Sequence, residues 1–260
     1  IEVERDQRDG RGVLVRALTA AGHTVRVLGH DSVRGAFGRD GAAPLPVPGL
    51  RPYDALTPIP PEEEMPFVVE HIWYARAFGA ELLATIDRLG PDLVLVDICL
   101  TYALVAALRS GVPTVVLGHF PYSLLLGPFA PLTAARLEET NAYATELGLV
   151  PLASHQMLIE SAPVVLVPTY RPFEAIGAFA PNVAHIGPCR SDDARAEPWP
   201  RRLPDRPLVL VGLSTSQQHQ TPLLQRLCDA LADLDIEGLV TTGPAIAPES
   251  LRASDNTTVT

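Results

Sequence analysis

The segment PDLVLVDICLTYALVAALRSGVPTVVLG, residues 91–118, limits the fold of this chain more than any other part of the sequence. A run rich in valine and leucine, Leu93–Val96, ends at Asp97, and a second apolar run covers Thr114–Leu117. The residues between the two runs are mostly apolar and have helical spacing. Strand, helix and strand in this order form a βαβ unit, because buried parallel strands are continuously apolar rather than alternating. We therefore predict an α/β protein built on parallel sheets.

Asp97 stands at the carboxyl end of the first strand of this unit. Ligands of open α/β sheets bind beyond the carboxyl ends of the strands, so Asp97 is the first candidate for a functional carboxylate. A carboxylate that caps a local helix or forms a salt bridge would stand at the same place, and this alternative remains open.

Composition excludes several classes of function. The chain has 260 residues, 47% of them hydrophobic, and a net charge of −10, which is typical of a globular protein and unfavourable for binding nucleic acid. All basic residues apart from histidine are arginine, which excludes a Schiff-base or P-loop lysine.

The cysteines and the charged amino-terminal residues indicate a cytoplasmic protein. Cys99, Cys189 and Cys228 are far apart and form no CxxC pair, as expected of free thiols in a reducing compartment. The first residues, IEVERDQRDG, do not resemble a signal peptide, and no apolar stretch approaches the roughly 18 residues of a membrane span. The seven histidines show no HExxH spacing, so we expect no metal site.

The rest of the chain repeats the strand and helix pattern on both sides of a linker. We predict an amino-terminal domain over residues 1–188, a linker over 189–206, and an incomplete second domain over 207–260, since a single βαβ unit cannot cover both faces of a sheet. The expected helices are Gly12–Ala21, Phe67–Leu89, Ala130–Leu147, Pro151–Ser161 and Pro222–Leu234. Further strands are expected at Thr24–Gly29, Val164–Val167, Ala184–Ile186, Leu208–Leu213 and Gly238–Thr242, with a short first strand at Ile1–Val3 and a Pro-rich irregular loop over Ala42–Glu64.

Three motifs in this order resemble the GT-B glycosyltransferases. They are AAGHTVRVLG near the start, the βαβ segment in the middle, and PLVLVGLSTSQQ after the linker, and the resemblance covers about Gly12 to Thr242. The chain is most similar to the group that glycosylates macrolides, aromatic polyketides and enediynes. The resemblance implies two Rossmann-like domains with parallel sheets, the second incomplete in this chain.

The resemblance also implies a reaction. In that family the first domain binds the acceptor and the second binds a nucleotide sugar, here TDP- or UDP-linked, which serves as co-substrate without any further cofactor. The expected activity is an inverting, metal-independent transfer of a hexosyl or deoxyhexosyl group to a hydroxyl of an apolar natural product, as in antibiotic biosynthesis. The partners would be the small-molecule aglycone and the nucleotide sugar. The sequence does not fix the oligomeric state, and a homodimer is compatible with it.

The catalytic base of the family is usually a histidine in the loop after the first strand, oriented by an aspartate that corresponds to Asp97. Gln7 stands where this histidine is expected, and Asp6 and Asp9 lie nearby. An amide cannot act as a base, so the resemblance leaves the base unassigned. Asp6 and Asp9 are more simply explained as part of a solvated segment.

The strand-to-helix turn of the second domain is the candidate donor site. Ser214, Thr215 and Ser216 match the turn that offers hydroxyl and N–H groups to the donor diphosphate in the family, although the same residues could simply cap the helix. The His-Gly-Gly signature that grips the pyrophosphate in the family does not occur in this chain.

Aromatic residues that follow one strand end, together with others on the predicted helix Phe67–Leu89, are the candidate acceptor site. We expect it to be lined by Trp73, Phe78, His119, Phe120 and Tyr122, because such pockets are mostly apolar with few polar groups. Aromatic residues at helical spacing are also typical of a core, and this alternative applies most to Trp73 and Phe78.

Other functions remain open on the sequence alone. The first is a non-catalytic GT-B homologue that binds the aglycone or partners an active transferase. A nucleotide-sugar epimerase of the same architecture is less favoured, because the chain has no lysine for its cleft. A dehydrogenase is disfavoured because no GxGxxG follows a strand.

Overall fold

The computed structural model describes residues 10–30, 37–38, 40–53, 57, 59–174, 179–189, 199–213 and 218–260. The predicted α/β class is confirmed, since every pair of strands described is parallel. The chain divides into two compact units. The N-terminal unit comprises Arg8–Pro52 and Pro66–Ser191, and the C-terminal unit comprises Asp192–Thr260 together with Tyr53–Met65. The first strand expected at Ile1–Val3 lies outside the described residues.

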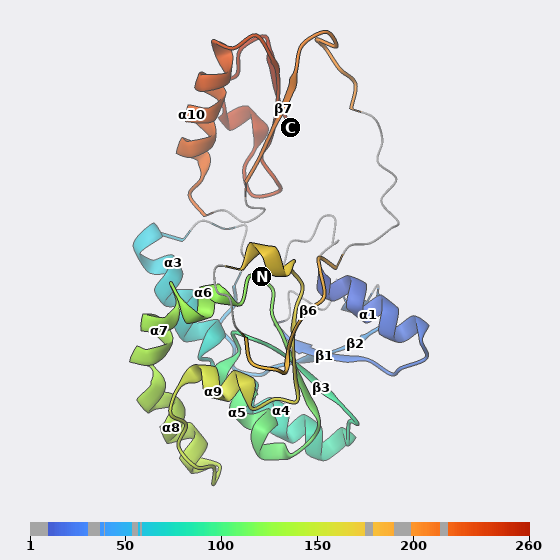
Figure 1. Ribbon diagram of the computed structural model, residues 1–260, viewed down its shortest axis with the longest axis vertical. Coiled ribbons are helices and arrows are strands. Elements are labelled where there is room, and N and C mark those ends of the chain that lie inside the picture. The colour runs from blue at the N-terminus through green and yellow to red at the C-terminus, as the bar shows by residue number, and fades with distance from the viewer. Residues whose placement is uncertain are drawn as a thin grey trace. The chain divides into compact units, whose positions relative to one another are not determined.

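The N-terminal unit contains two parallel sheets (Figure 1). In the larger sheet the strands follow the chain in the order β3-β4-β5-β6, and the smaller sheet pairs β1 with β2. The register places Asp97, the last residue of β3, opposite Leu117, the last residue of β4. The strands are β1 (Arg26–Gly29), β2 (Ala43–Pro46), β3 (Val94–Asp97), β4 (Thr114–Leu117), β5 (Val164–Val167) and β6 (Val183–His185).

The helices of this unit connect and cover these strands. They are α1 (Gly10–Ala20), α4 (Arg76–Leu89), α5 (Thr101–Ser110), α6 (Ser123–Leu126), α7 (Ala130–Ala135), α8 (Leu137–Glu146) and α9 (His155–Glu160). Helix α3 (Pro61–Val68) begins in the segment Tyr53–Met65, which belongs to the C-terminal unit, and only its last residues belong to this one. A short 3-10 helix, η3 (Arg171–Phe173), follows β5.

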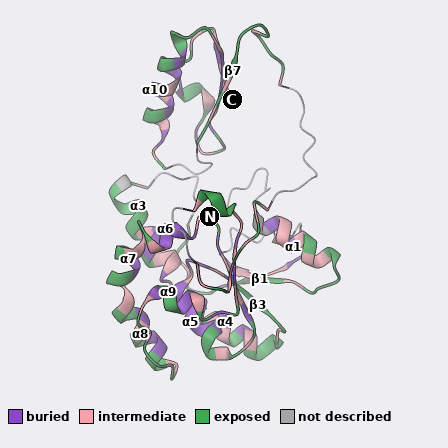
Figure 2. Ribbon diagram, viewed as in Figure 1, coloured by how far each residue is buried: buried purple, intermediate pink, exposed green. Residues whose placement is uncertain are grey.

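Helix α5 forms the centre of the core (Figure 2). It packs against α4, α8, α9, β3 and β4, and every residue from Thr101 to Ala107 is buried. A helix that is apolar on all sides must be buried, and the sequence TYALVAALRS meets that condition until its last turn. It ends at Gly111, whose φ of +70° is the left-handed conformation that favours glycine at a helix end. Asp97 is thus held next to the most buried helix of the unit.

Two expectations from the sequence are wrong between residues 42 and 89. The Pro-rich segment Ala42–Glu64 is not irregular throughout, because it contains β2 and the start of α3. The single helix expected over Phe67–Leu89 is divided into α3, a π-helical turn η2 (Val69–Trp73) and α4. The N–H of Tyr74 donates to the carbonyl of Val69, five residues back, across 2.9 Å, and the extended Ala75 then separates the turn from α4.

Two further predicted helices differ in extent. The helix expected over Ala130–Leu147 is interrupted at Arg136, which separates α7 from α8. The helix expected over Pro151–Ser161 is limited to α9, because the hydroxyl of Ser154 accepts the N–H of Met157 across 3.1 Å and caps the helix at that point.

The C-terminal unit has one parallel sheet in the order β7-β8-β9. Its elements are β7 (Leu208–Gly212), α10 (Thr221–Ala232), β8 (Glu237–Thr241), the 3-10 helix η4 (Pro248–Ser250) and β9 (Thr257–Val259), and of these η4 and β9 were not predicted. The apolar face of α10 packs on the sheet through Leu224, Cys228 and Leu231. Buried Glu237 accepts the N–H groups of Arg202 and Leu203, which fixes the residues just before β7 to this sheet.

Candidate active site

Asp97 and His119 form a hydrogen-bonded pair at the carboxyl ends of β3 and β4. Nδ1 of His119 lies 3.0 Å from Oδ2 of Asp97. The other carboxylate oxygen, Oδ1, accepts the N–H of Cys99 across 2.9 Å. The side chains of His119 and Asp97 are 30% and 19% exposed, so both can be reached from solvent.

The strand register explains why these two residues meet. Asp97 is paired with Leu117, and His119 follows Leu117 by two residues, so both side chains belong to the same edge of the sheet. An aspartate oxygen accepts a hydrogen bond, so the Nδ1 that faces Asp97 is the donor. The lone pair of the neutral ring is then on Nε2. A histidine with this orientation can accept a proton at Nε2 while the carboxylate stabilises the charged ring.

A row of aromatic rings extends from His119. The ring centroids of His119 and Phe120 are 4.6 Å apart, those of Phe120 and Phe129 are 5.7 Å apart, and those of Phe129 and Trp73 are 5.6 Å apart. The structure thus brings His119, Phe120 and Trp73 together, as members of one row. Phe129, which joins Phe120 to Trp73, was missed by the sequence analysis because nothing in its spacing relates it to Trp73.

Phe78 and Tyr122 are placed differently. Both are buried in the core, with exposures of 5% and 1%. The hydroxyl of Tyr122 donates to Oε1 of Glu160 across 2.9 Å, and burial together with this bond raises the pKa of Tyr122. Their burial shows a packing role, and contact with an acceptor stays a prediction for these two residues.

Glu174 holds the loop that carries His119. Its carboxylate is fully buried and accepts the N–H groups of Tyr122 and Ser123, each across 2.8 Å, and Nε2 of His185 across 3.0 Å. Burial raises the pKa of Glu174, but the hydrogen bonds from Ser123, Tyr122 and His185 outweigh this effect, and the net pKa is lowered. The carboxylate is therefore ionised, and it fixes the start of α6.

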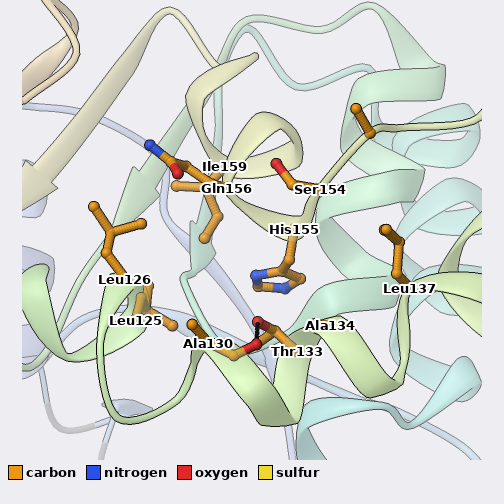
Figure 3. A pocket seen from close by; sticks show the side chains of 11 residues that line it. Leu125, Leu126, Ala130, Thr133, Ala134, Leu137, Ser154, His155, Gln156 and Ile159 are labelled. Atoms are coloured by element: carbon orange, nitrogen blue, oxygen red, sulfur yellow. Dashed lines mark hydrogen bonds between the residues drawn. The ribbon is translucent and has the colours of Figure 1, made fainter.

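A pocket of about 230 Å³ lies between α6, α7, α8 and α9 (Figure 3). In Figure 3 the ring of His155 projects toward α7, between leucine side chains of α6 and α8. Nε2 of His155 is 3.1 Å from the hydroxyl of Thr101, and burial lowers the pKa of His155 to about 4. The lining residues are Leu125, Leu126, Ala130, Thr133, Ala134, Leu137, Ala153, Ser154, His155, Gln156 and Ile159. The sequence analysis missed this pocket because its residues come from four short helices whose packing has no sequence signature.

Cys99 adds a sulfur atom to the Asp97–His119 pair. One ligand atom each from Asp97, Cys99 and His119 lies within 4.8 Å of the other two. Carboxylate, thiolate and imidazole are all zinc ligands, so these residues could hold a metal ion. The spacing of the histidines did not indicate this group, because His119 reaches it through the pairing of two strands.

The candidate donor residues Ser214, Thr215 and Ser216 lie outside the described residues, as do Asp6, Gln7 and Asp9. Their assignments stay predictions. No helix in the described part of the chain is long and apolar enough to cross a membrane.

Comparison with protein families decides the classification. The model of Glycosyltransferase Family 4 matches residues 13–147, which include both members of the Asp97–His119 pair. The chain belongs to Glycosyltransferase Family 4. Comparison with curated proteins gives no match.

Solved structures of glycosyltransferases share the fold of this family 4 chain. The glycosyltransferase of kitacinnamycin matches with a TM-score of 0.70 and 22% identity, over 96% of this chain and 66% of its own. The calicheamicin glycosyltransferase CalG4 gives a TM-score of 0.70 and 19% identity, over 100% of this chain and 67% of its own. The glycosyltransferase VinC in complex with dTDP matches with a TM-score of 0.59 and 20% identity, over 98% of this chain and 69% of its own. The predicted GT-B fold is confirmed, and the chain spans about two thirds of the length of these structures.

Proposed function

We propose that this protein transfers a sugar from a nucleotide diphosphate to a hydroxyl of an apolar natural product, with inversion and without a metal ion. The observation that carries the proposal is the hydrogen bond between His119 and Asp97 at the carboxyl edge of the sheet. Membership of Glycosyltransferase Family 4 supports sugar transfer as the class of reaction.

In the proposed step His119 is the general base. Nε2 of His119 removes the proton of the acceptor hydroxyl while the acceptor oxygen attacks the anomeric carbon of the donor. The bond from that carbon to the diphosphate oxygen breaks, and the nucleoside diphosphate leaves with the bonding electrons. A single displacement of this kind inverts the anomeric configuration. Asp97 orients the ring through Nδ1 and stabilises the imidazolium that forms.

The aromatic row next to the base is the proposed acceptor wall. Trp73, Phe120 and Phe129 present ring edges and faces to one another, an arrangement that suits a planar or apolar aglycone. The names of the similar structures, which are glycosyltransferases of kitacinnamycin and calicheamicin, agree with an acceptor of this class.

For the donor we propose a TDP-linked sugar, with a UDP-linked sugar as the alternative. VinC, a structure similar to this chain, is in complex with dTDP. Ser214, Thr215 and Ser216 are the proposed contacts to its diphosphate. We further propose that the protein is cytoplasmic, because its three cysteines are free. We also propose a homodimer, which light scattering of the purified protein would test.

The activity is tested by incubating the full-length protein with TDP-glucose or UDP-glucose and methylumbelliferone, with and without EDTA. We expect a β-glucoside from the α-linked donor, at equal rates in both buffers. An α-glucoside would contradict inversion, and a rate lost with EDTA would contradict metal independence. Binding of methylumbelliferone without release of the nucleoside diphosphate would favour the alternative that the protein is a non-catalytic homologue.

A further inference from the structure

We propose that Asp97, Cys99 and His119 form a site for Zn²⁺, and that the ion inhibits the enzyme when it occupies this site. Binding of the ion is inferred from the structure alone. Its inhibitory effect rests on the proposed function, because it assumes that His119 is the base.

The geometry brings one oxygen, one nitrogen and one sulfur ligand together. The ligand atoms lie within 4.8 Å of one another, and the closest pair, Nδ1 of His119 and Oδ2 of Asp97, is 3.0 Å apart. Zinc bonds of about 2.0–2.3 Å to these atom types place tetrahedral ligands somewhat closer together than 4.8 Å, so small side-chain rotations suffice.

The ligand set selects the metal. A thiolate favours Zn²⁺ over Mg²⁺ and Ca²⁺, which prefer oxygen ligands. Three protein ligands leave a fourth position for water, as in open zinc sites, and the partial exposure of His119 and Asp97 lets solvent reach that position. Cys99 is only 5% exposed, so its sulfur approaches the ion from the protein side.

Binding would remove the base. The thiol of Cys99 must release its proton to solvent before sulfur can bind the ion. The ion then takes the lone pair of Nδ1, which the neutral ring provides by carrying its proton on Nε2 instead. With a proton on Nε2, the ring cannot accept one from an acceptor hydroxyl. Zinc and catalysis therefore compete for the same histidine.

Cobalt binding to the purified full-length protein tests the site without any activity measurement. A thiolate ligand gives Co²⁺ a charge-transfer band in the near ultraviolet, and added Zn²⁺ abolishes the band by displacing the cobalt. We expect the band in the wild type and in C228S, which changes a buried cysteine of the C-terminal unit, and its loss in C99S. The C99S variant keeps the backbone N–H at position 99 that donates a hydrogen bond to Oδ1 of Asp97. A band that persists in C99S, or its absence from the wild type, would overturn the proposal.

If C99S does not fold, proton release decides the question in the wild type. Zn²⁺ added in weakly buffered solution with a pH indicator is expected to release protons together with binding, because the thiol is deprotonated. Binding without proton release would contradict a thiolate ligand.

Inhibition is measured separately. Zn²⁺ is expected to inhibit sugar transfer by the wild type, and the concentration for half inhibition is expected to rise about tenfold or more in C99S. Equal inhibition of both proteins would contradict a role for this site. If no acceptor is glycosylated at all, the proposed function fails, while the cobalt spectrum still decides whether the metal site exists.

Discussion

The backbone N–H of Ser123 donates to Oε2 of Glu174 across 2.8 Å, which ties the loop after β4 to the segment after β5. The same carboxylate accepts the N–H of Tyr122, so the chain just beyond His119 is attached at two successive residues. The position of the proposed base therefore depends on a carboxylate that never contacts it.

Glu174→Gln is expected to destabilise the N-terminal unit by about 2 kcal/mol, because an amide NH₂ cannot accept one of the two N–H groups. Urea unfolding measures this, with exposed Glu138→Gln as the control that should change stability by less than about 0.5 kcal/mol. The pKa of Glu174 is lowered from 4.5, so its contribution is present above that pH and is lost as the pH falls below it. Equal loss of stability in acid by the wild type and Glu174→Gln would contradict this account.

Gly79→Ala is expected to destabilise the packing of α4 on α5 by roughly 1–3 kcal/mol, as overpacking does. An added Cβ would lie 2.7 Å from the carbonyl oxygen of Tyr102 and would also overlap the hydroxyl of Tyr143. This carbonyl belongs to the backbone of α5, so it cannot move away without distorting that helix. Thermal unfolding compares this variant with Ala80→Ser, an exposed change on the same helix. A melting temperature equal to that of the control would show that the two helices can separate at little cost.

His155 is expected to make the protein less stable in mild acid. Burial lowers its pKa from 6.5 to about 4, so the unfolded chain binds a proton that the folded chain rejects. Stability is complete above pH 6.5 and falls as the pH decreases toward 4, by about 3 kcal/mol in total from this group. His155→Gln should remove this part of the pH dependence, while exposed His23→Gln should leave it unchanged. If the stability of His155→Gln decreases with falling pH as steeply as that of the wild type, groups other than His155 cause the pH dependence.

Asp97→Asn is expected to lower kcat by about 100-fold or more, because an amide neither stabilises the imidazolium nor fixes Nδ1 as the donor. The KM for the nucleotide sugar should change little. Asp92→Asn provides the matched control, since Asp92 is an exposed aspartate just before the same strand. Wild-type turnover in folded Asp97→Asn would remove Asp97 from the mechanism.

Much of the fold was predictable from local patterns. The buried parallel strands are continuously apolar, so Val164–Val167 was predicted with the bounds that the structure gives to β5, and β4 likewise. β2 was not predicted, because Pro44 and Pro46 interrupt any strand pattern. They are tolerated there because β2 pairs on one side only among the described residues, with β1. The π-helical turn η2 also has no periodic signal.

The candidate site was only partly predictable. Asp97 was predicted as a functional carboxylate from its place at a strand end. His119 was also singled out, from its place after the next strand, but it was predicted to line the acceptor site rather than to act as the base. Their hydrogen bond depends on the register of β3 against β4, which no spacing in the sequence reveals. Cys99 joins the pair for the same reason, since its distance from His119 along the chain says nothing about their distance in space.

The most direct test of the account is the kcat of His119→Phe in the full-length protein, with TDP-glucose or UDP-glucose and methylumbelliferone as substrates. Phenylalanine keeps an aromatic ring beside Phe120 but has no lone pair, so the variant separates a base from a wall of the acceptor site. If His119 is the base, kcat falls by about 100-fold or more while the variant melts like the wild type. If folded His119→Phe turns over at the wild-type rate, His119 only lines the acceptor site and the proposed mechanism is wrong.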